Sequence, residues 1–251
     1  MRAAGLDIGS RTIELAVVED GQLVDWHIED TGHEPNLACD RLLAGTKHDA
    51  LVATGYGRAL AEIAFAAPTV TEIRAHAVGA RHLVESCRTV IDVGGQDTKA
   101  IGLDESGRAT RFEMNDRCAA GTGRFLEVMA QALRYDLGEL GEAALASGAP
   151  AKVNSMCTVF AESEVVSLLT KGVPRQEIAR GLHAAIVERT YAMVSRVSVE
   201  PPIVFTGGGA LNGCLRSLLE DRLGVSLVVP DNPQLVGALG AALLAQNGAK
   251  L

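Results

Sequence analysis

Apolar and polar positions follow a pattern that occurs twice along the chain. Apolar or alternating runs at residues 3–9, 13–19 and 22–28 predict three successive strands, and residues 89–93, 98–103 and 109–114 predict three more. Single strands are expected at 50–54, 203–206 and 226–229. Helices are predicted at 73–85, 123–135, 159–171, 175–198, 214–223 and 234–245. Strand sets that each lead into helices predict an α/β fold with two similar lobes.

The two strand sets contain the same short motif. Residues 6–12 read LDIGSRT and residues 91–99 read IDVGGQDTK, which aligns Asp7 with Asp92, Gly9 with Gly94 and Ser10 with Gly95. In each copy an apolar strand ends in an acidic residue and a glycine turn. Such a turn lets backbone N–H groups approach an anion, and hydroxyls such as that of Thr98 add donors. A hairpin turn is the alternative explanation for a single copy, but two copies favour a phosphate site.

We therefore expect the two turns to bind a nucleotide in a cleft between the lobes. The residues predicted to contact it are Gly9, Ser10, Arg11, Thr12, Gly94, Gly95, Gln96, Asp97 and Lys99. Asp7 and Asp92 are expected to hold magnesium through water, because this ion keeps its hydration shell. We predict a first lobe from residues 1–88 plus 234–251 and a second lobe from residues 89–233.

A third glycine cluster follows the strand at 203–206. Residues 203–212 read IVFTGGGALN and resemble the adenosine motif of the actin, sugar-kinase and heat-shock ATPase superfamily, which implies that fold. The residues expected on the adenosine side are Gly207, Gly208, Gly209, Asn212 and Gln234. Neither a P-loop nor a dinucleotide-binding G-x-G-x-x-G turn is present in the sequence.

Composition narrows the choice of partner. The 251 residues carry a formal net charge of −8, with 47% hydrophobic and 22% charged residues. A negative balance argues against nucleic acid or an anionic membrane as a partner. No apolar run approaches the roughly 20 residues that span a bilayer. We expect a cytoplasmic protein.

Two of the five cysteines lie in unusual surroundings. None of the five forms a C-x-x-C pair, and Cys39, Cys87 and Cys214 are interpreted as small buried residues. Cys118 and Cys157 each lie in a polar turn before a predicted helix, a setting that favours thiolate. A four-iron cluster uses four thiolates, so two such cysteines predict a cluster shared by a homodimer. Two inert thiols are the alternative.

Longer motifs carry a resemblance to one family. Residues 115–126 (NDRCAAGTGRFL) and 157–165 (CTVFAESEV) resemble the activator component of 2-hydroxyacyl-CoA dehydratases. That family of ATPases includes the ATP-binding subunits of benzoyl-CoA reductase and the reductases of double-cubane cluster proteins. Residues 53–58, 90–97 and 237–242 also match, so the resemblance extends over nearly the whole chain.

The resemblance implies an ATP-driven one-electron donor. Members of that family are homodimers that hold one [4Fe-4S] cluster through two cysteines per chain, which correspond to Cys118 and Cys157. The expected cofactors are this cluster, ATP or ADP, and magnesium. The expected electron donor is ferredoxin or flavodoxin, and the acceptor is an acyl-CoA dehydratase, an aryl-CoA reductase or a double-cubane protein. A small-molecule kinase or a nucleotide-gated switch without a redox role is the alternative.

Several polar residues are candidates for catalysis or for coupling the nucleotide to the cluster, and the glutamates among these candidates have a second explanation. Glu72 and Gln96 are the candidates for catalysis; Glu72 lies 20 residues before Asp92, as in superfamily phosphatases that orient water with a glutamate. A carboxylate facing the helix dipole is the alternative for Glu72. Glu162 and Glu164 are candidates for coupling nucleotide to cluster, or are surface residues. Many family members have Lys where this chain has Glu14, which leaves Lys99 as the equivalent cation.

Overall fold

The computed structural model describes residues 1–154 and 157–248, and the chain divides into two compact units. Unit 1 comprises Met1–Val90, Ile101–Phe112 and Pro230–Leu251, and unit 2 comprises Ile91–Ala100 and Glu113–Val229. Residues 249–251, which we assign to the first lobe, lie outside the described residues. Each unit contains one copy of the repeated glycine-turn motif.

The sheet of unit 1 has the strand order β3-β2-β1-β4. Its strands are β1 (Arg2–Ile8), β2 (Thr12–Glu19), β3 (Gln22–Asp30) and β4 (Ala50–Thr54). The first three form an antiparallel meander, as predicted, whereas β4 pairs with β1 in parallel. The β2–β3 turn contains Asp20 and Gly21, both with positive φ, as expected for a tight hairpin. The register places Asp7 directly opposite Glu14.

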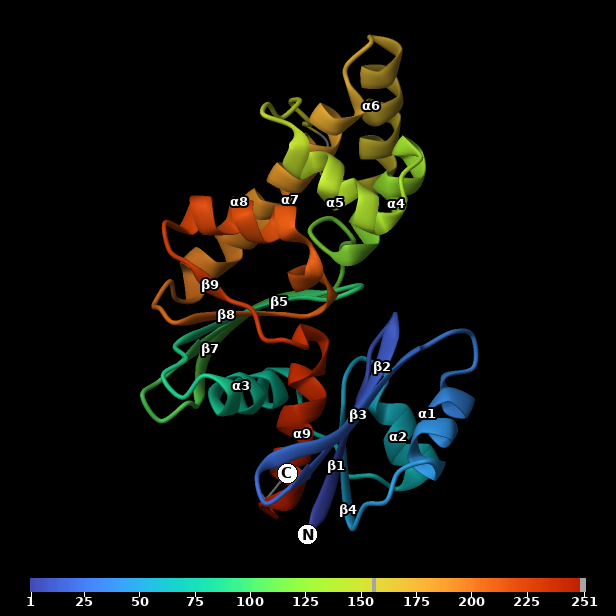
Figure 1. Cartoon of the computed structure of the whole chain (residues 1–251), viewed down its shortest axis with the longest axis vertical. Helices are drawn as coiled ribbons and strands as arrows, with labels where there is room; N and C mark the ends of the chain where they lie inside the picture. The colour runs from blue at the N-terminus through green and yellow to red at the C-terminus, as the bar shows by residue number, and fades with distance from the viewer. Residues whose placement is uncertain (155–156, 249–251) are drawn as a thin grey trace. The chain divides into compact units, whose positions relative to one another are not determined.

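Helices cover both faces of this sheet (Figure 1). Ala4, Leu6 and Leu15 belong to one apolar cluster with residues of α1 (Pro35–Ala44) and α2 (Arg58–Phe65). The opposite face packs against α3 (Glu72–Leu83) and α9 (Val236–Gln246). Glycines allow α9 to approach closely, because a Cβ at Gly5 would overlap the backbone of α9. The carboxyl end of β1 is thereby held next to the first turn of α9.

The second sheet has the order β7-β6-β5-β8-β9. Its strands are β5 (Thr89–Val93), β6 (Thr98–Leu103), β7 (Ala109–Asn115), β8 (Ile203–Thr206) and β9 (Leu227–Val228). The helices of unit 2 are α4 (Gly123–Leu133), α5 (Leu137–Ala146), α6 (Thr158–Thr170), α7 (Arg175–Val197) and α8 (Gly213–Leu223). One core joins them to the sheet and includes Phe125, Met129, Ile186 and Phe205.

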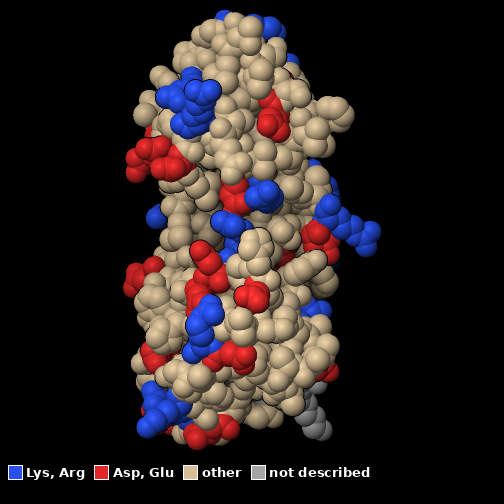
Figure 2. Space-filling view, turned by 90° about the vertical axis from the view of Figure 1, so that its right-hand side faces the viewer, with Lys and Arg blue, Asp and Glu red and all other residues tan. Residues whose placement is uncertain are grey.

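Charged side chains are interspersed on the face shown in Figure 2. Basic and acidic residues alternate there with uncharged ones, and no extended basic area forms on that face. None of the helices within residues 1–154 and 157–248 combines the length and the apolar character needed to cross a bilayer.

Candidate nucleotide site and cysteine loops

The glycine turn of the second repeat connects β5 to β6. Asp92 is the penultimate residue of β5 and is only 3% exposed, because β6 and β8 flank this strand. The Gly94 N–H donates to the Asp97 carbonyl at 2.9 Å and closes the turn. A Cβ at Gly94 would lie 2.6 Å from Asp97 Oδ1, so the turn tolerates only glycine there without rearrangement. Gly95 is half-buried and Gln96 is exposed.

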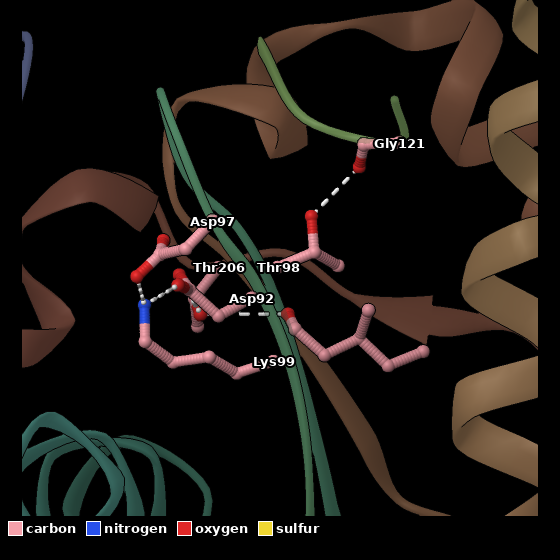
Figure 3. A network of polar contacts seen from close by, with 7 residues as sticks. Asp92, Asp97, Thr98, Lys99, Gly121 and Thr206 are labelled. Carbon is pink, nitrogen blue, oxygen red and sulfur yellow. Dashed lines mark hydrogen bonds and ion pairs between the residues drawn. The ribbon is translucent and has the colours of Figure 1, made fainter. Parts of the chain in front are cut away.

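Lys99 lies between the two carboxylates of this turn (Figure 3). Its Nζ is 3.1 Å from Asp92 Oδ2 and 2.8 Å from Asp97 Oδ2, and the residue is 2% exposed. Thr206 Oγ1 donates to the other oxygen, Asp92 Oδ1, at 2.9 Å. Buried charges are costly unless they are paired, and Lys99 supplies that pairing for both acids. Its predicted contact with a phosphate stays a prediction.

The third glycine cluster packs against the end of β5. Gly207 has φ 81°, and a Cβ there would lie 2.5 Å from the Val93 carbonyl oxygen and 2.7 Å from Asp92 Oδ1. A Cβ at Gly209 would lie 2.6 Å from the Val93 side chain. Unit 2 therefore brings the second phosphate turn and the predicted adenosine turn side by side. Glycine is required there by this close approach as well as by backbone conformation.

Asn212 caps α8. Its Oδ1 accepts hydrogen bonds from the N–H groups of Cys214 and Leu215 at 3.0 and 3.1 Å. Its Nδ2 lies 3.0 Å from Nε2 of the buried His183, whose Nδ1 is 2.8 Å from the Ala179 carbonyl. These partners assign a neutral ring that donates from Nδ1 and accepts at Nε2. Burial lowers the pKa of His183, which favours this neutral form. The predicted adenosine contact of Asn212 stays a prediction beside its observed capping role.

In unit 1, Asp7 occupies the position equivalent to Asp92 and has different neighbours. Asp7 and Glu14, opposite each other on β1 and β2, are 8% and 5% exposed. The Asp7 carboxylate lies against Gly55 and Gly237, where a Cβ would overlap its oxygens. The same Cβ at Gly237 would lie 3.1 Å from Nε2 of the buried His76. The sequence signal for Gly55 and Gly237 was their place in matching motifs, whereas nothing in it related His76 to Asp7.

Thr31 makes two hydrogen bonds to the glycine turn of the first repeat. Its hydroxyl donates to the Gly9 carbonyl at 2.8 Å, and its N–H donates to the Arg11 carbonyl at 2.9 Å. Ser10 and Thr12 are half-buried, whereas Arg11 is exposed. The sequence reasoning missed Thr31, which follows the predicted meander and has no local motif.

Two further predicted residues, Glu72 and Gln234, lie at or just before the start of a helix. Glu72 is the first residue of α3, directly after Thr71, whose hydroxyl accepts from the Arg74 N–H at 3.4 Å. This placement is the one required by the helix-dipole interpretation of Glu72, while a role in orienting water stays a prediction. Gln234 lies in the short helix η2 (Pro233–Leu235) before α9 and is half-buried.

The two singled-out cysteines differ in their distance from a helix. Cys157 is exposed and immediately precedes α6, as predicted. Cys118 is half-buried, and four further residues separate it from α4. Ahead of Cys157, the Asn154 N–H donates to both carboxylate oxygens of Glu164 at 3.0 and 3.1 Å. Glu164 therefore holds Asn154 in place, while Glu162 is exposed.

The other three cysteines are buried, as the sequence indicated. Burial raises the pKa of Cys39 to about 11 and that of Cys214 to about 11. These thiols remain protonated at neutral pH and are poor metal ligands. The thiols that a cluster could reach are therefore Cys118 and Cys157, both of which have solvent access.

The described part of the chain offers a metal ion few side-chain ligands in one place. Within the described ranges, no group of three or more His, Cys, Asp or Glu side chains is arranged around a common metal position. Both oxygens of Asp92 already have a partner, Thr206 on one and Lys99 on the other. The predicted contact of Asp92 with magnesium through water stays a prediction.

Known proteins are similar to this chain over nearly its whole length. The activator of lactoyl-CoA dehydratase from Anaerotignum propionicum is 41% identical over 259 residues, covering 100% of this chain and 99% of that protein. The solved structure of the activator of the 2-hydroxyisocaproyl-CoA dehydratase from Clostridium difficile, with bound ADPNP, is 38% identical with a TM-score of 0.90. It covers 100% of this chain and 96% of that one.

A more distant structure supports the fold alone. A ROK family glucokinase from Streptomyces griseus, solved with glucose and AMPPNP, has a TM-score of 0.63 at 15% identity, covering 99% of this chain and 100% of that one. The expected α/β fold of the actin and sugar-kinase type is confirmed. Residues 4–245 match the BadF/BadG/BcrA/BcrD ATPase family, and this chain belongs to that family.

Proposed function

We propose that this chain is an ATP-dependent one-electron donor that activates an iron–sulfur enzyme. It uses ATP hydrolysis to drive low-potential electron transfer through a [4Fe-4S] cluster shared by two copies of the chain. The observation that carries this proposal lies within unit 2. There the second repeat lies against the predicted adenosine turn, and it also bonds to the start of α4 and, through Thr98, to Gly121, which follows Cys118 closely in the chain.

Nucleotide binding is supported by the turns and by the relative with bound ADPNP. In this proposal the glycine turns at Gly9, Gly94 and Gly207 provide backbone N–H groups and close approach to the nucleotide. Asp7 and Asp92 hold magnesium through water. Lys99 and Asp97 complete the charged surroundings of the second turn, and Gln96 and Glu72 are the candidates for orienting the attacking water.

The proposed cluster is supported by the contrast among the thiols. Cys118 and Cys157 have solvent access, whereas Cys39, Cys87 and Cys214 do not. Two thiolates per chain meet the requirement for four when two chains meet on a two-fold axis. Val159 and Phe160, in the first turn of α6 after Cys157, are 69% and 67% exposed, and a second copy would cover them. When bound, the cluster supplies one-electron redox chemistry, which the side chains lack.

The proposed partners follow from the relatives. Proteins about 40% identical to this chain are named activators of 2-hydroxyacyl-CoA dehydratases, so the acceptor is an acyl-CoA dehydratase or a related reductase. The donor is a ferredoxin or flavodoxin. We place the protein in the cytoplasm, where reducing conditions keep thiols available to iron.

Iron and labile sulfide, measured per chain together with oligomeric mass, test the cluster. The protein is purified without oxygen as wild type, Cys118→Ser, Cys157→Ser and the buried-thiol control Cys39→Ala. We expect about two irons per chain in a dimer for the wild type and the control, because one four-iron cluster is shared. Each serine variant should lose the iron. An iron-free wild type, or iron retained in both serine variants, would refute the shared cluster.

A further inference from the structure

The second phosphate turn caps the helix that follows Cys118. The Gly123 N–H donates to the Gly94 carbonyl at 2.9 Å, and the Arg124 N–H donates to the Gly95 carbonyl at 2.8 Å. The first N–H groups of a helix have no partner within it, and the N-cap residue Thr122 makes no side-chain capping bond. The start of α4 is thus held by the backbone of the phosphate turn.

Thr98 makes a third link between the same two segments. Its side-chain oxygen, buried on β6, donates to the Gly121 carbonyl at 2.7 Å (Figure 3). The sequence reasoning expected this hydroxyl to face a phosphate, but its single proton is used by Gly121. Gly121 has φ 90°, and a Cβ there would lie 2.8 Å from Arg189 Cδ of α7. Residues 118–122, here named the Cys118 loop, are therefore confined from both sides.

Hydrogen bonds also connect the parts of the Cys118 loop to one another. The Asn115 side-chain amide donates to the carbonyls of Cys118 and Ala120 at 2.9 and 3.0 Å. The Thr122 hydroxyl donates to the Ala119 carbonyl at 2.8 Å. Together with the bond from Thr98, these contacts engage every carbonyl from Cys118 to Gly121. A displacement at Gly121 is therefore passed to Cys118 through a short, hydrogen-bonded segment.

Peptide planarity explains how a phosphate could displace this loop. The Gly94 carbonyl and the Gly95 N–H belong to one rigid peptide unit, as do the Gly95 carbonyl and the Gln96 N–H. In both peptide units the carbonyl oxygen accepts a hydrogen bond from a backbone N–H group at the start of α4. A phosphate that draws the N–H end toward itself must tilt the unit, and its carbonyl end then shifts the start of α4. The following strand residue Thr98 shifts Gly121 in the same way.

We propose that Thr98 is a positioning residue that passes the state of the second phosphate turn to Cys118. The inference rests on the proposed nucleotide binding and names the side chain through which that binding reaches a cysteine. Thr98→Val keeps the shape of the side chain and removes the donor, whereas Thr98→Ser keeps the donor. A purely structural threonine would be replaced by valine without loss of the response to nucleotide.

Hydrogen–deuterium exchange of the full-length protein tests this inference without requiring a loaded cluster. Exchange of peptides covering 115–126 is followed with and without the non-hydrolysable analogue ADPNP and magnesium, and calorimetry measures nucleotide binding separately. In the wild type and Thr98→Ser we expect the nucleotide to slow exchange by about fivefold, the factor typical of one neutral hydrogen bond. In Thr98→Val the nucleotide-induced change within residues 118–122 should fall below about twofold, whereas residues 123–124, bonded to the Gly94 and Gly95 carbonyls, should still respond.

The outcomes separate this inference from the proposed function. A wild type that binds ADPNP without any change in residues 115–126 would overturn the inference and leave nucleotide binding intact. A full response in Thr98→Val would also overturn it, and Thr98→Ala replaces this variant if the valine protein fails to fold. A wild type that does not bind ADPNP at all would refute the proposed nucleotide site, and this route with it.

Discussion

The buried lysine of the second repeat shows how single residues determine the state of this site. Lys99 has both Asp92 and Asp97 within ion-pair distance; Lys99 and Asp92 are buried, and Asp97 is half-buried. Removal of one partner from a buried ion pair leaves the other charge without compensation, which costs more than an exposed pair would. Asp92 also accepts from Thr206, so the effect should extend to the neighbouring adenosine turn.

We predict that Lys99→Met lowers the free energy of unfolding by about 3–5 kcal/mol. Urea denaturation at neutral pH, followed by circular dichroism, measures this loss. The matched control is Arg124→Met, which removes an exposed arginine paired with Glu127 at 2.9 Å and should cost less than about 1 kcal/mol. Equal small losses in the two variants would show that Lys99 does not neutralise the two acids.

The first repeat has an acid where the second has this lysine. Glu14 lies opposite Asp7, and both are buried, so the first repeat has a second buried acid at the position where the second repeat has a buried cation. We predict that Glu14→Lys tightens ATP binding, because it replaces an acid near the proposed phosphate site by a cation. Calorimetric dissociation constants test this, with Glu14→Gln expected to lie between Glu14→Lys and the wild type. Weaker binding in both variants would contradict the expectation and indicate that Glu14 is needed as an acid.

His183 makes stability depend on pH. Burial lowers its folded-state pKa below the ordinary 6.5, so the folded protein keeps it neutral while the unfolded chain takes up a proton as pH falls. Its contribution is present above about pH 6.5 and is lost as pH falls from there toward the folded pKa. Urea denaturation at several pH values should show a shallower decline for His183→Gln than for the wild type. Parallel declines would contradict this assignment.

At the residue scale, the sequence predicted which residues belong to the second turn better than it predicted which groups their side chains contact. The repeated motif identified Asp92, Asp97 and Lys99 together because they occupy one turn. It did not predict that Lys99 pairs with both acids, or that the Thr98 hydroxyl bonds to Gly121, since these contacts depend on side-chain direction in the folded chain. The neighbourhood of Asp7 and His76 was also missed, because they come from distant elements.

At the scale of elements, the close fit of α5 against the cap of α8 depends on glycine. A Cβ at Gly141 would lie 3.0 to 3.2 Å from three atoms of the Asn212 side chain, which is fixed by its own hydrogen bonds. A Cβ at Gly138, on the same helix, would meet nothing within 4 Å. Two glycines on one helix therefore differ in whether they are required.

We predict that Gly141→Ala destabilises the protein, whereas Gly138→Ala is neutral or stabilises it by up to about 1 kcal/mol through lower unfolded-state entropy. Thermal unfolding of both variants and the wild type provides the measurement. Because both substitutions add the same methyl group to α5, helix propensity contributes in the same direction to each. A stabilised Gly141→Ala protein would show that Asn212 can move aside without cost.

Strands were predicted more completely than short helices. The two meanders were located correctly because apolar alternation and the Asp20-Gly21 turn are local signals. The helices α1, α2 and α5 were missed. The α5 segment contains Gly138 and Gly141, which oppose helix formation, and its signal was the capping box formed by Asp136 and Glu139. Tertiary packing, which the sequence does not display, stabilises these short segments.

At the scale of the whole molecule, the duplication read from the sequence corresponds to two compact units with one motif copy in each. The two copies have diverged, with an acid pair at Asp7 and Glu14 in one and a lysine-bridged pair of acids in the other. The lobe boundaries at 88/89 and 233/234, and the homodimer, stay predictions. They concern arrangements that local sequence patterns do not encode.

A single-turnover measurement shows whether ATP controls electron transfer from this protein to an iron–sulfur enzyme. The anaerobic dimer is reduced, freed of excess reductant and mixed with an iron–sulfur 2-hydroxyacyl-CoA dehydratase, and the return of cluster absorbance is followed. We predict rapid reoxidation with magnesium and ATP, and little with ADP or without nucleotide. Reoxidation at the same rate in all three conditions, or a protein with no reducible chromophore, would contradict it.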